Sequence, residues 1–143
     1  MKPKQELNCV FCMAQSNPGE EYRIIKRQTE LFVVLTQMPQ NLGHLMVIPT
    51  AHYSTLTEIP KKILAMLLQA AIAYGEKLQK RLQAKAYVLR VNNNLYLLED
   101  HPNNNHVGHI HFHVIPRYKA EDSLETTRPS EKELTQIKKQ LSS

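Results

Sequence analysis

Histidine and apolar residues alternate without interruption from His109 to Val114, within the segment GHIHFHVIPRY. Side chains on an extended strand point alternately to its two faces, so this pattern predicts a strand over 109–116. One face carries three imidazoles, at His109, His111 and His113, and the other face carries apolar side chains. The segment therefore requires a sheet with one face packed on a core and one face available for polar chemistry.

The rest of the chain predicts the other parts of an α+β fold. Short runs of β-branched and aromatic residues predict strands, and apolar residues at helical spacing predict one long helix with Pro60 in its first turn and Gly75 as a weak point. Ser130 and Glu133 match a capping box, which predicts a short C-terminal helix. The predicted strands cover 22–27, 31–36, 44–49, 86–91 and 109–116, and the long helix covers about 60–82. Three strands before any helix favour a five-stranded, mostly antiparallel sheet.

Length and composition limit the architecture further. A chain of 143 residues with 42% hydrophobic and 22% charged residues is expected to form a single domain, with a core over about 8–118 and a tail with the short helix over 119–143. No apolar run approaches the roughly 18 residues of a membrane span, and the polar start lacks the apolar core of a signal peptide. We therefore expect a cytoplasmic protein with no membrane partner. The net charge of +5 favours anionic partners, but the scattered basic residues do not predict a nucleic-acid surface.

Cys9 and Cys12 are the only cysteines, and their C-x-x-C spacing has three interpretations. A thioredoxin-like redox pair is expected to follow a strand and open a helix, and no strand is predicted before this pair. The pair is otherwise half of a zinc site, or two reduced thiols packed among apolar residues.

The alternating histidines also have several interpretations. At roughly 3.3 Å per residue the outer two are about 13 Å apart, so one ion cannot bind all three without a bend in the strand. A His-x-His pair that shares a metal remains an alternative, as does a half-exposed strand without a function. Imidazole titrates near neutral pH, so a row of histidines can supply a nucleophile, an acid and a phosphate ligand together.

Three motifs together resemble the histidine triad (HIT) family of nucleotide hydrolases and transferases. The segment GHIHFHVIPRY resembles the triad motif, and GHLMVIPTAH, from Gly43 to His52, resembles the second motif of the family. The segment CVFC, from Cys9 to Cys12, resembles the opening of the zinc-containing prokaryotic members. These motifs span residues 9–118, so the resemblance implies a HIT-like fold for most of the chain.

The resemblance implies a separate role for each histidine of the site. His111 matches the histidine that attacks the α-phosphorus of a nucleotide and forms a nucleotidyl-histidine, which water then hydrolyses. A neutral imidazole is a competent nucleophile only when an acceptor holds its other nitrogen, and in the family a backbone carbonyl near the residue matched by His44 does this. His113 and His44 match residues that lie beside the phosphates and stabilise developing charge.

The first triad histidine is implied to belong to a zinc site instead. In the zinc-bearing members the C-x-x-C pair, the later histidine of the second motif and the first triad histidine complete a tetrahedron. These positions match Cys9, Cys12, His52 and His109. Two thiolates and two imidazoles leave no position for a reacting water, so the expected zinc is structural.

Other positions match the family less closely. Asn93 matches a polar residue that contacts the ribose or the α-phosphate, although a turn-forming asparagine is an equal alternative. Thr36 stands where many members carry an Asp or Asn that binds the ribose, so nucleoside binding is expected to be weaker or different. Asn105 and His106 replace the residues that contact the phosphates and the leaving group, which leaves the leaving-group specificity open.

The expected function is hydrolysis of a phosphoramidate or a dinucleoside polyphosphate to release a nucleoside monophosphate. GHLMVIPTAH also resembles the branch that phosphorolyses diadenosine tetraphosphate, so phosphate is an alternative acceptor to water. A nucleotide-binding protein with little turnover and a metal-dependent enzyme that uses His109 and His111 as ligands are further alternatives. Family members are commonly homodimers, so the expected partners are a small nucleotide substrate and a second copy of the chain.

Overall fold

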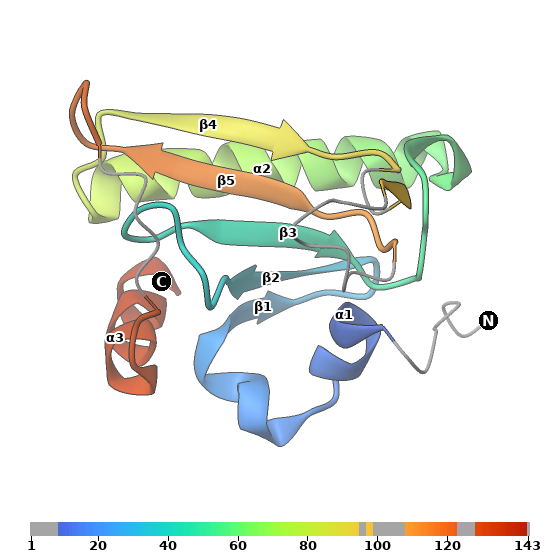
Figure 1. Ribbon diagram of the computed structural model, residues 1–143, viewed down its shortest axis with the longest axis horizontal. Helices are drawn as coiled ribbons and strands as arrows, with labels where there is room; N and C mark the ends of the chain where they lie inside the picture. Colours follow the sequence, from blue (N-terminus) through green and yellow to red (C-terminus); the bar gives the residue numbers. More distant parts are fainter. Residues whose placement is uncertain (1–8, 95–96, 99–107, 123–127, 143) are drawn as a thin grey trace.

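The computed structural model describes residues 9–94, 97–98, 108–122 and 128–142, and these form a five-stranded antiparallel sheet with helices on both faces (Figure 1). The strand order is β1-β2-β3-β5-β4, and every neighbouring pair is antiparallel. In chain order the elements are α1 (Val10–Ala14), the 3₁₀ helix η1 (Pro18–Arg23), β1 (Ile24–Arg27), β2 (Leu31–Leu35), β3 (Leu45–Pro49), η2 (Leu56–Glu58), α2 (Lys61–Arg81), β4 (Ala86–Val91), β5 (Phe112–Arg117) and α3 (Glu131–Leu141). The predicted α+β fold is confirmed.

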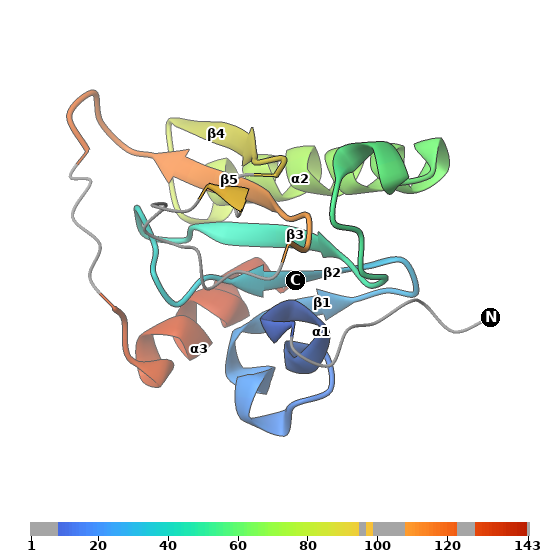
Figure 2. The same ribbon diagram turned by 45° about the vertical axis from the view of Figure 1, so that its right-hand side comes forward.

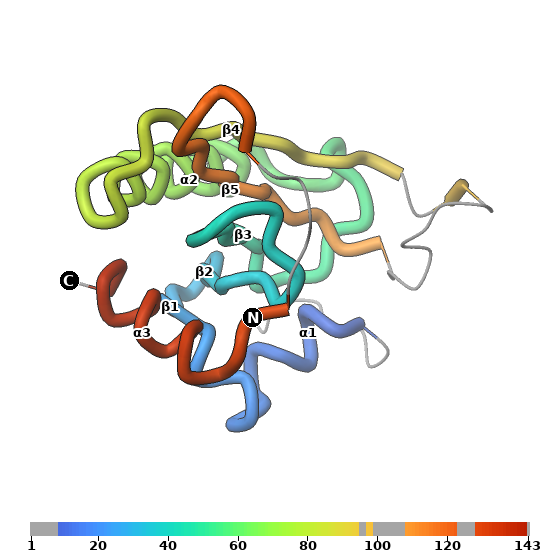
Figure 3. Tube along the Cα trace, turned by 60° about the vertical axis from the view of Figure 1, so that its left-hand side comes forward, coloured from blue at the N-terminus to red at the C-terminus, as the bar shows by residue number. Residues whose placement is uncertain are grey.

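Helices α2 and α3 lie on one face of the sheet, and α1 lies on the other face. Helix α2 packs along β3, β4 and β5, and α3 packs near β1 and η1 (Figure 2). Figure 3 shows α3 and α1 on opposite sides of the sheet. Strands β2 and β3 are buried along their whole length, because the side chains on both faces of each strand are covered. The face under α2 and α3 packs Val33, Val47 and Val114, whereas the face under α1 packs Phe32, Val34 and Met46.

Helix α2 begins one residue later than expected, with Pro60 as its N-cap instead of in its first turn. Gly75, the predicted weak point, lies where the ring of Tyr87 from β4 packs against the helix. A Cβ at this position would lie 2.5 Å from Cζ of Tyr87. The glycine therefore lowers the helix propensity of α2 but allows α2 to approach the sheet closely.

Two strand boundaries differ from the prediction by more than one residue, at the starts of β1 and β5. Residues 22 and 23 belong to η1, because Asn17 and Pro18 start a 3₁₀ helix that Asn17 caps by accepting from the Gly19 N–H. Strand β5 begins at Phe112, so the prediction of a strand over the first three residues of 109–116 is wrong. The ladder between β3 and β5 ends at Val47 and Phe112, and the Ile110 N–H donates instead to the Tyr53 carbonyl at 2.8 Å.

The predicted capping box and C-terminal helix are confirmed. The Ser130 hydroxyl accepts from the Glu133 N–H, and the Glu133 carboxylate accepts from the Ser130 N–H. The apolar residues Leu134, Ile137 and Leu141 are buried against the core. No helix in the described part of the chain combines the length and the apolar composition needed to span a bilayer.

Candidate active site and metal centre

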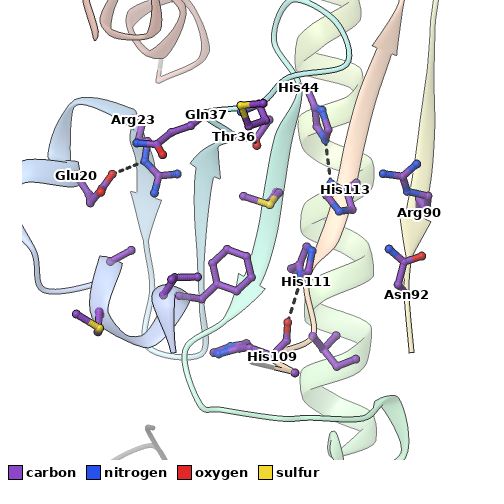
Figure 4. Close-up of a pocket in the computed structure, with 18 of the residues that line it drawn as sticks. Glu20, Arg23, Thr36, Gln37, His44, Arg90, Asn92, His109, His111 and His113 are labelled. Atoms are coloured by element: carbon purple, nitrogen blue, oxygen red, sulfur yellow. Dashed lines mark hydrogen bonds and ion pairs between the residues drawn. The ribbon is translucent and has the colours of Figure 1, made fainter. Parts of the chain in front are cut away.

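A cavity of about 530 Å³ opens on the α1 side of the sheet. Residues of α1 and η1 form one wall, and the histidines at and before the start of β5 form the opposite wall (Figure 4). The predicted residues Thr36, His44, His111 and His113 all line it. The alternation of the triad persists although the strand starts late, since Ile110 and Phe112 are buried in the core on the opposite face.

Cys9, Cys12, His52 and His109 form a buried cluster that adjoins this cavity, since His109 also lines it. Sγ of Cys9 lies 3.2 Å from Nδ1 of His109, and Sγ of Cys12 lies 3.5 Å from Nδ1 of His52. Zinc bonds of about 2.3 Å to sulfur and about 2.0–2.1 Å to nitrogen in a tetrahedron place S and N about 3.6 Å apart. The four ligand atoms lie within 4.8 Å of one another, so the cluster is able to bind a metal ion.

Hydrogen bonding prepares His109 as a ligand. Its Nε2 lies 2.9 Å from the Pro49 carbonyl, which can only accept, so Nε2 carries the proton and Nδ1 presents a lone pair to the thiols. Burial lowers the pKa of His109 to about 4 and raises the pKa of the Cys9 thiol to about 11. Burial therefore disfavours the thiolate that a metal needs, and a bound cation would favour it.

His111 is held by a backbone carbonyl, but not the one expected. Its Nδ1 lies 2.9 Å from the carbonyl oxygen of His109, whereas the resemblance placed the acceptor near His44. The acceptor comes from the same segment because residues 109–111 lie outside the β3–β5 ladder, which leaves this carbonyl available. Nδ1 therefore donates, and Nε2 of His111 keeps its lone pair.

His44 and His113 form a hydrogen-bonded pair at the upper end of the cavity (Figure 4). The Gln40 N–H donates to Nδ1 of His44 at 3.0 Å, so the proton of neutral His44 is on Nε2. Nε2 of His44 lies 2.9 Å from Nδ1 of His113, and the remaining N–H of neutral His113 is then on its Nε2. Burial, followed by the charge of Arg90, lowers the pKa of His44 to about 4 and keeps this imidazole neutral at pH 7.

Gly43 allows His44 to take this position. Its φ is +92°, and a Cβ there would lie 2.6 Å from Cδ1 of Leu82 and 2.9 Å from Cδ2 of Leu78. Only glycine suits both the left-handed backbone and the contact with the end of α2.

The sequence reasoning missed Arg90 and Asn92, which line the cavity beside the histidines. Arg90 is the register partner of His113 across β4 and β5, and Figure 4 places Asn92 next to His111. Alternation along β4 was the available signal, but using it required knowing that β4 pairs with β5. Arg23 was also missed. It is buried at the far wall, where it pairs with Glu20 and donates to the Leu35 carbonyl.

The remaining predicted site residues have different placements. The Asn93 side chain points to η2, where Oδ1 accepts from the Leu56 N–H at 2.7 Å, and Asn93 does not line the cavity. The Thr36 hydroxyl accepts from the Met38 N–H at 3.2 Å while the residue lines the cavity. Asn105 and His106 lie outside the described residues.

Comparisons with known proteins show which family the chain belongs to. The family model described as HIT domain matches residues 19–120. A HIT-like protein of Methanocaldococcus jannaschii is 30% identical over 116 residues, which cover 81% of this chain and 84% of the relative. The adenosine 5′-monophosphoramidase of Saccharomyces cerevisiae is 25% identical, and the match covers 81% of this chain and 66% of the yeast protein.

A solved structure supports the fold assignment. The crystal structure of a zinc-bound histidine triad family protein from Mycobacterium smegmatis superposes with a TM-score of 0.72 at 22% identity and covers 93% of this chain and 92% of the other. The antiparallel sheet, the row of histidines and the family match place the chain in the class of histidine triad proteins. The chain belongs to the HIT family.

Proposed function

We propose that the protein is a hydrolase that cleaves a nucleoside monophosphate from a phosphoramidate or a dinucleoside polyphosphate. The observation that carries this proposal is the hydrogen bond from Nδ1 of His111 to the His109 carbonyl. It leaves Nε2 with a lone pair in the cavity that the hydrogen-bonded pair of His44 and His113 also lines. A fixed tautomer is what a neutral histidine nucleophile requires.

The reaction proceeds in two transfers. Nε2 of His111 forms a bond to the α-phosphorus, and the bond from phosphorus to the leaving group breaks with its electron pair. An amine leaving group takes up one proton from solvent, and a water molecule that later attacks the phosphorus releases one proton to solvent as the bond to His111 breaks. The N–H on Nε2 of His113 stabilises charge on the phosphoryl oxygens in both steps.

The nucleoside is proposed to lie along the cavity floor, with its ribose near Thr36. Asn92 takes the phosphate-side position that the resemblance assigned to Asn93, because Asn92 lines the cavity and Asn93 caps η2. Contacts of Asn105 and His106 with the phosphates remain predictions for the residues before the triad.

The metal in the cluster is proposed to be zinc with a structural role. Two thiols and two imidazole Nδ1 atoms are the ligands that zinc prefers, and they fill a tetrahedron without a water position. Zinc would fix α1, which forms one wall of the cavity, against the segment that carries His111.

A cytoplasmic homodimer is proposed as the working form. Strand β4 lies at the edge of the sheet, and Val88 on it is exposed. An exposed edge strand with an apolar side chain is a surface that a second copy can cover.

Substitution of the nucleophile tests the proposed reaction. His111→Ala is expected to lower kcat on adenosine 5′-phosphoramidate by at least about 1,000-fold, because no covalent intermediate forms, while nucleotide binding changes less than about fivefold. Mass spectrometry of wild-type protein quenched during turnover is expected to find the nucleotidyl adduct on His111.

Unchanged turnover in the His111→Ala variant would contradict the mechanism. The products identify the acceptor in the same experiment. A nucleoside diphosphate that forms only when inorganic phosphate is present would replace water by phosphate as the acceptor.

A further inference from the structure

A second, smaller cavity of about 120 Å³ continues the site beyond His113. It shares Arg90 and Gln40 with the large cavity, so the two cavities are adjacent. Side chains two residues apart on a strand share a face, which places Ile115 and Arg117 on the same face as His111 and His113. The small cavity therefore lies farther along β5 on the histidine face, on the side away from residues 109–111.

The polar side chains around this cavity differ in whether they already have a hydrogen-bond or ion-pair partner. Arg117 donates from Nε to Oδ2 of Asp122 at 2.9 Å and from Nη2 to the Ala120 carbonyl, so its charge is balanced within the wall. The amide of Asn41 donates to the Pro116 carbonyl. Within the described ranges, the Arg90 guanidinium and the Gln40 side-chain amide have no hydrogen-bond or ion-pair partner. One uncompensated cation and one amide donor thus face the junction of the two cavities.

Arg90 lies next to the hydrogen-bonded pair of His44 and His113. It is the direct cross-strand neighbour of His113, a relation that places Cβ atoms about 4.5–5.5 Å apart. Burial is the main cause of the lowered pKa of His44 and the charge of Arg90 is the second, so His44 is expected to stay neutral at pH 7 without Arg90. An anion at this junction would contact Arg90 on one side and lie next to the phosphoryl group at His111 on the other.

We propose that this small cavity, with Arg90 and Gln40, is a binding site for the phosphate group that follows the α-phosphate, which makes polyphosphates the preferred substrate class. This inference rests on the proposed function and adds the leaving group to it. When His111 attacks a polyphosphate, the bond from the α-phosphorus to the bridging oxygen breaks and its electron pair stays on that oxygen. The departing polyphosphate gains one negative charge, which a guanidinium stabilises without any proton transfer.

Arg90 is not expected to stabilise the leaving group of a phosphoramidate. The leaving amine takes up a proton and departs without negative charge, so a cation at this junction gives it no stabilisation. Arg90 should therefore discriminate between the two substrate classes, whereas a residue that contacts only the α-phosphate would affect both equally.

The test compares two substrates in matched charge variants. Arg90→Gln is expected to lower kcat/KM on diadenosine tetraphosphate by about 20-fold or more and on adenosine 5′-phosphoramidate by less than about threefold. Arg90→Lys keeps the charge but loses the bidentate geometry, so it is expected to retain part of the polyphosphate activity. Lys85→Gln removes one exposed positive charge just before β4 and is expected to change either value less than about threefold.

Equal losses on the two substrates, no loss on either, or an equal loss in Lys85→Gln would overturn the inference. Binding of inorganic tripolyphosphate, measured by calorimetry, separates this proposal from the proposed function because it needs no turnover. Tripolyphosphate that binds the wild type and His111→Ala equally, and Arg90→Gln about 10-fold more weakly, supports the site even if neither nucleotide is cleaved. Binding that does not depend on Arg90 overturns it.

Discussion

At the scale of single residues, hydrogen-bond acceptors decide what each imidazole can do. His109 and His111 each donate from one nitrogen to a carbonyl, so the lone pair is on Nδ1 of His109 and on Nε2 of His111. The alternating pattern correctly predicted which histidines share a face. It could not predict the acceptors, because the His109 carbonyl is free only where the backbone leaves the ladder, and that depends on the partner strand.

The buried, neutral His44 makes stability depend on pH. Its pKa is about 4 in the folded chain and about 6.5 in the unfolded chain, so the unfolded state binds more protons between these values. The contribution to the free energy of unfolding is constant above pH 6.5, falls as the pH drops through 6.5 to 4, and levels off below that. Urea unfolding at pH 7 and pH 4.5 should show a drop about 2 kcal/mol smaller in His44→Gln than in the wild type. The same drop in both proteins would show that His44 does not titrate in this way.

At the scale of elements, local signals predicted the long segments and missed the short ones. Strand alternation, helical spacing and the capping box correctly indicated five strands, α2 and α3. Helix α1 has only five residues, and its N-cap makes no side-chain hydrogen bond. The local sequence therefore contains no capping or spacing signal that predicts this helix. Contacts with the sheet and the cysteine–histidine cluster stabilise it instead, and such contacts are not visible in the sequence.

Gly75 tests the packing of α2 on β4. Gly75→Ala is expected to lower the free energy of unfolding by about 1 kcal/mol, because crowding against the Tyr87 ring outweighs the gain in helix propensity. In a Tyr87→Ala background the same substitution should instead stabilise the protein by about 0.5–1 kcal/mol. A double-mutant cycle measured by chemical denaturation checks both signs, and equal effects in the two backgrounds would contradict the packing argument.

At the scale of the whole molecule, the cysteine–histidine cluster joins parts of the chain that are far apart in sequence. Cys9 and His109 are 100 residues apart, and their ligand atoms lie 3.2 Å from each other. The motifs predicted this set of four residues through the family resemblance. Spacing alone left three interpretations of the cysteines open, because the distance between Cys12 and His52 is set by the fold and not by the local sequence.

Metal removal should therefore affect stability before it affects chemistry. Treatment with a chelator is expected to lower Tm by more than about 5 °C, and zinc should be found at one equivalent per chain by elemental analysis. Cys12→Ser should contain less metal and show no further decrease in Tm with chelator. An unchanged Tm with no bound metal would favour two reduced thiols, and activity that is lost at constant Tm would favour a metal-dependent enzyme.

The position of Arg90 on an exposed edge strand has a consequence for how the protein can diverge. His111, the proposed nucleophile, depends on backbone geometry next to the buried cluster, so most substitutions around it are expected to destabilise the fold. Arg90 is exposed and lies outside the hydrophobic core, so its replacement should leave the fold intact. Single substitutions at Arg90 would then change the leaving-group specificity during evolution, while the proposed covalent chemistry at His111 is kept.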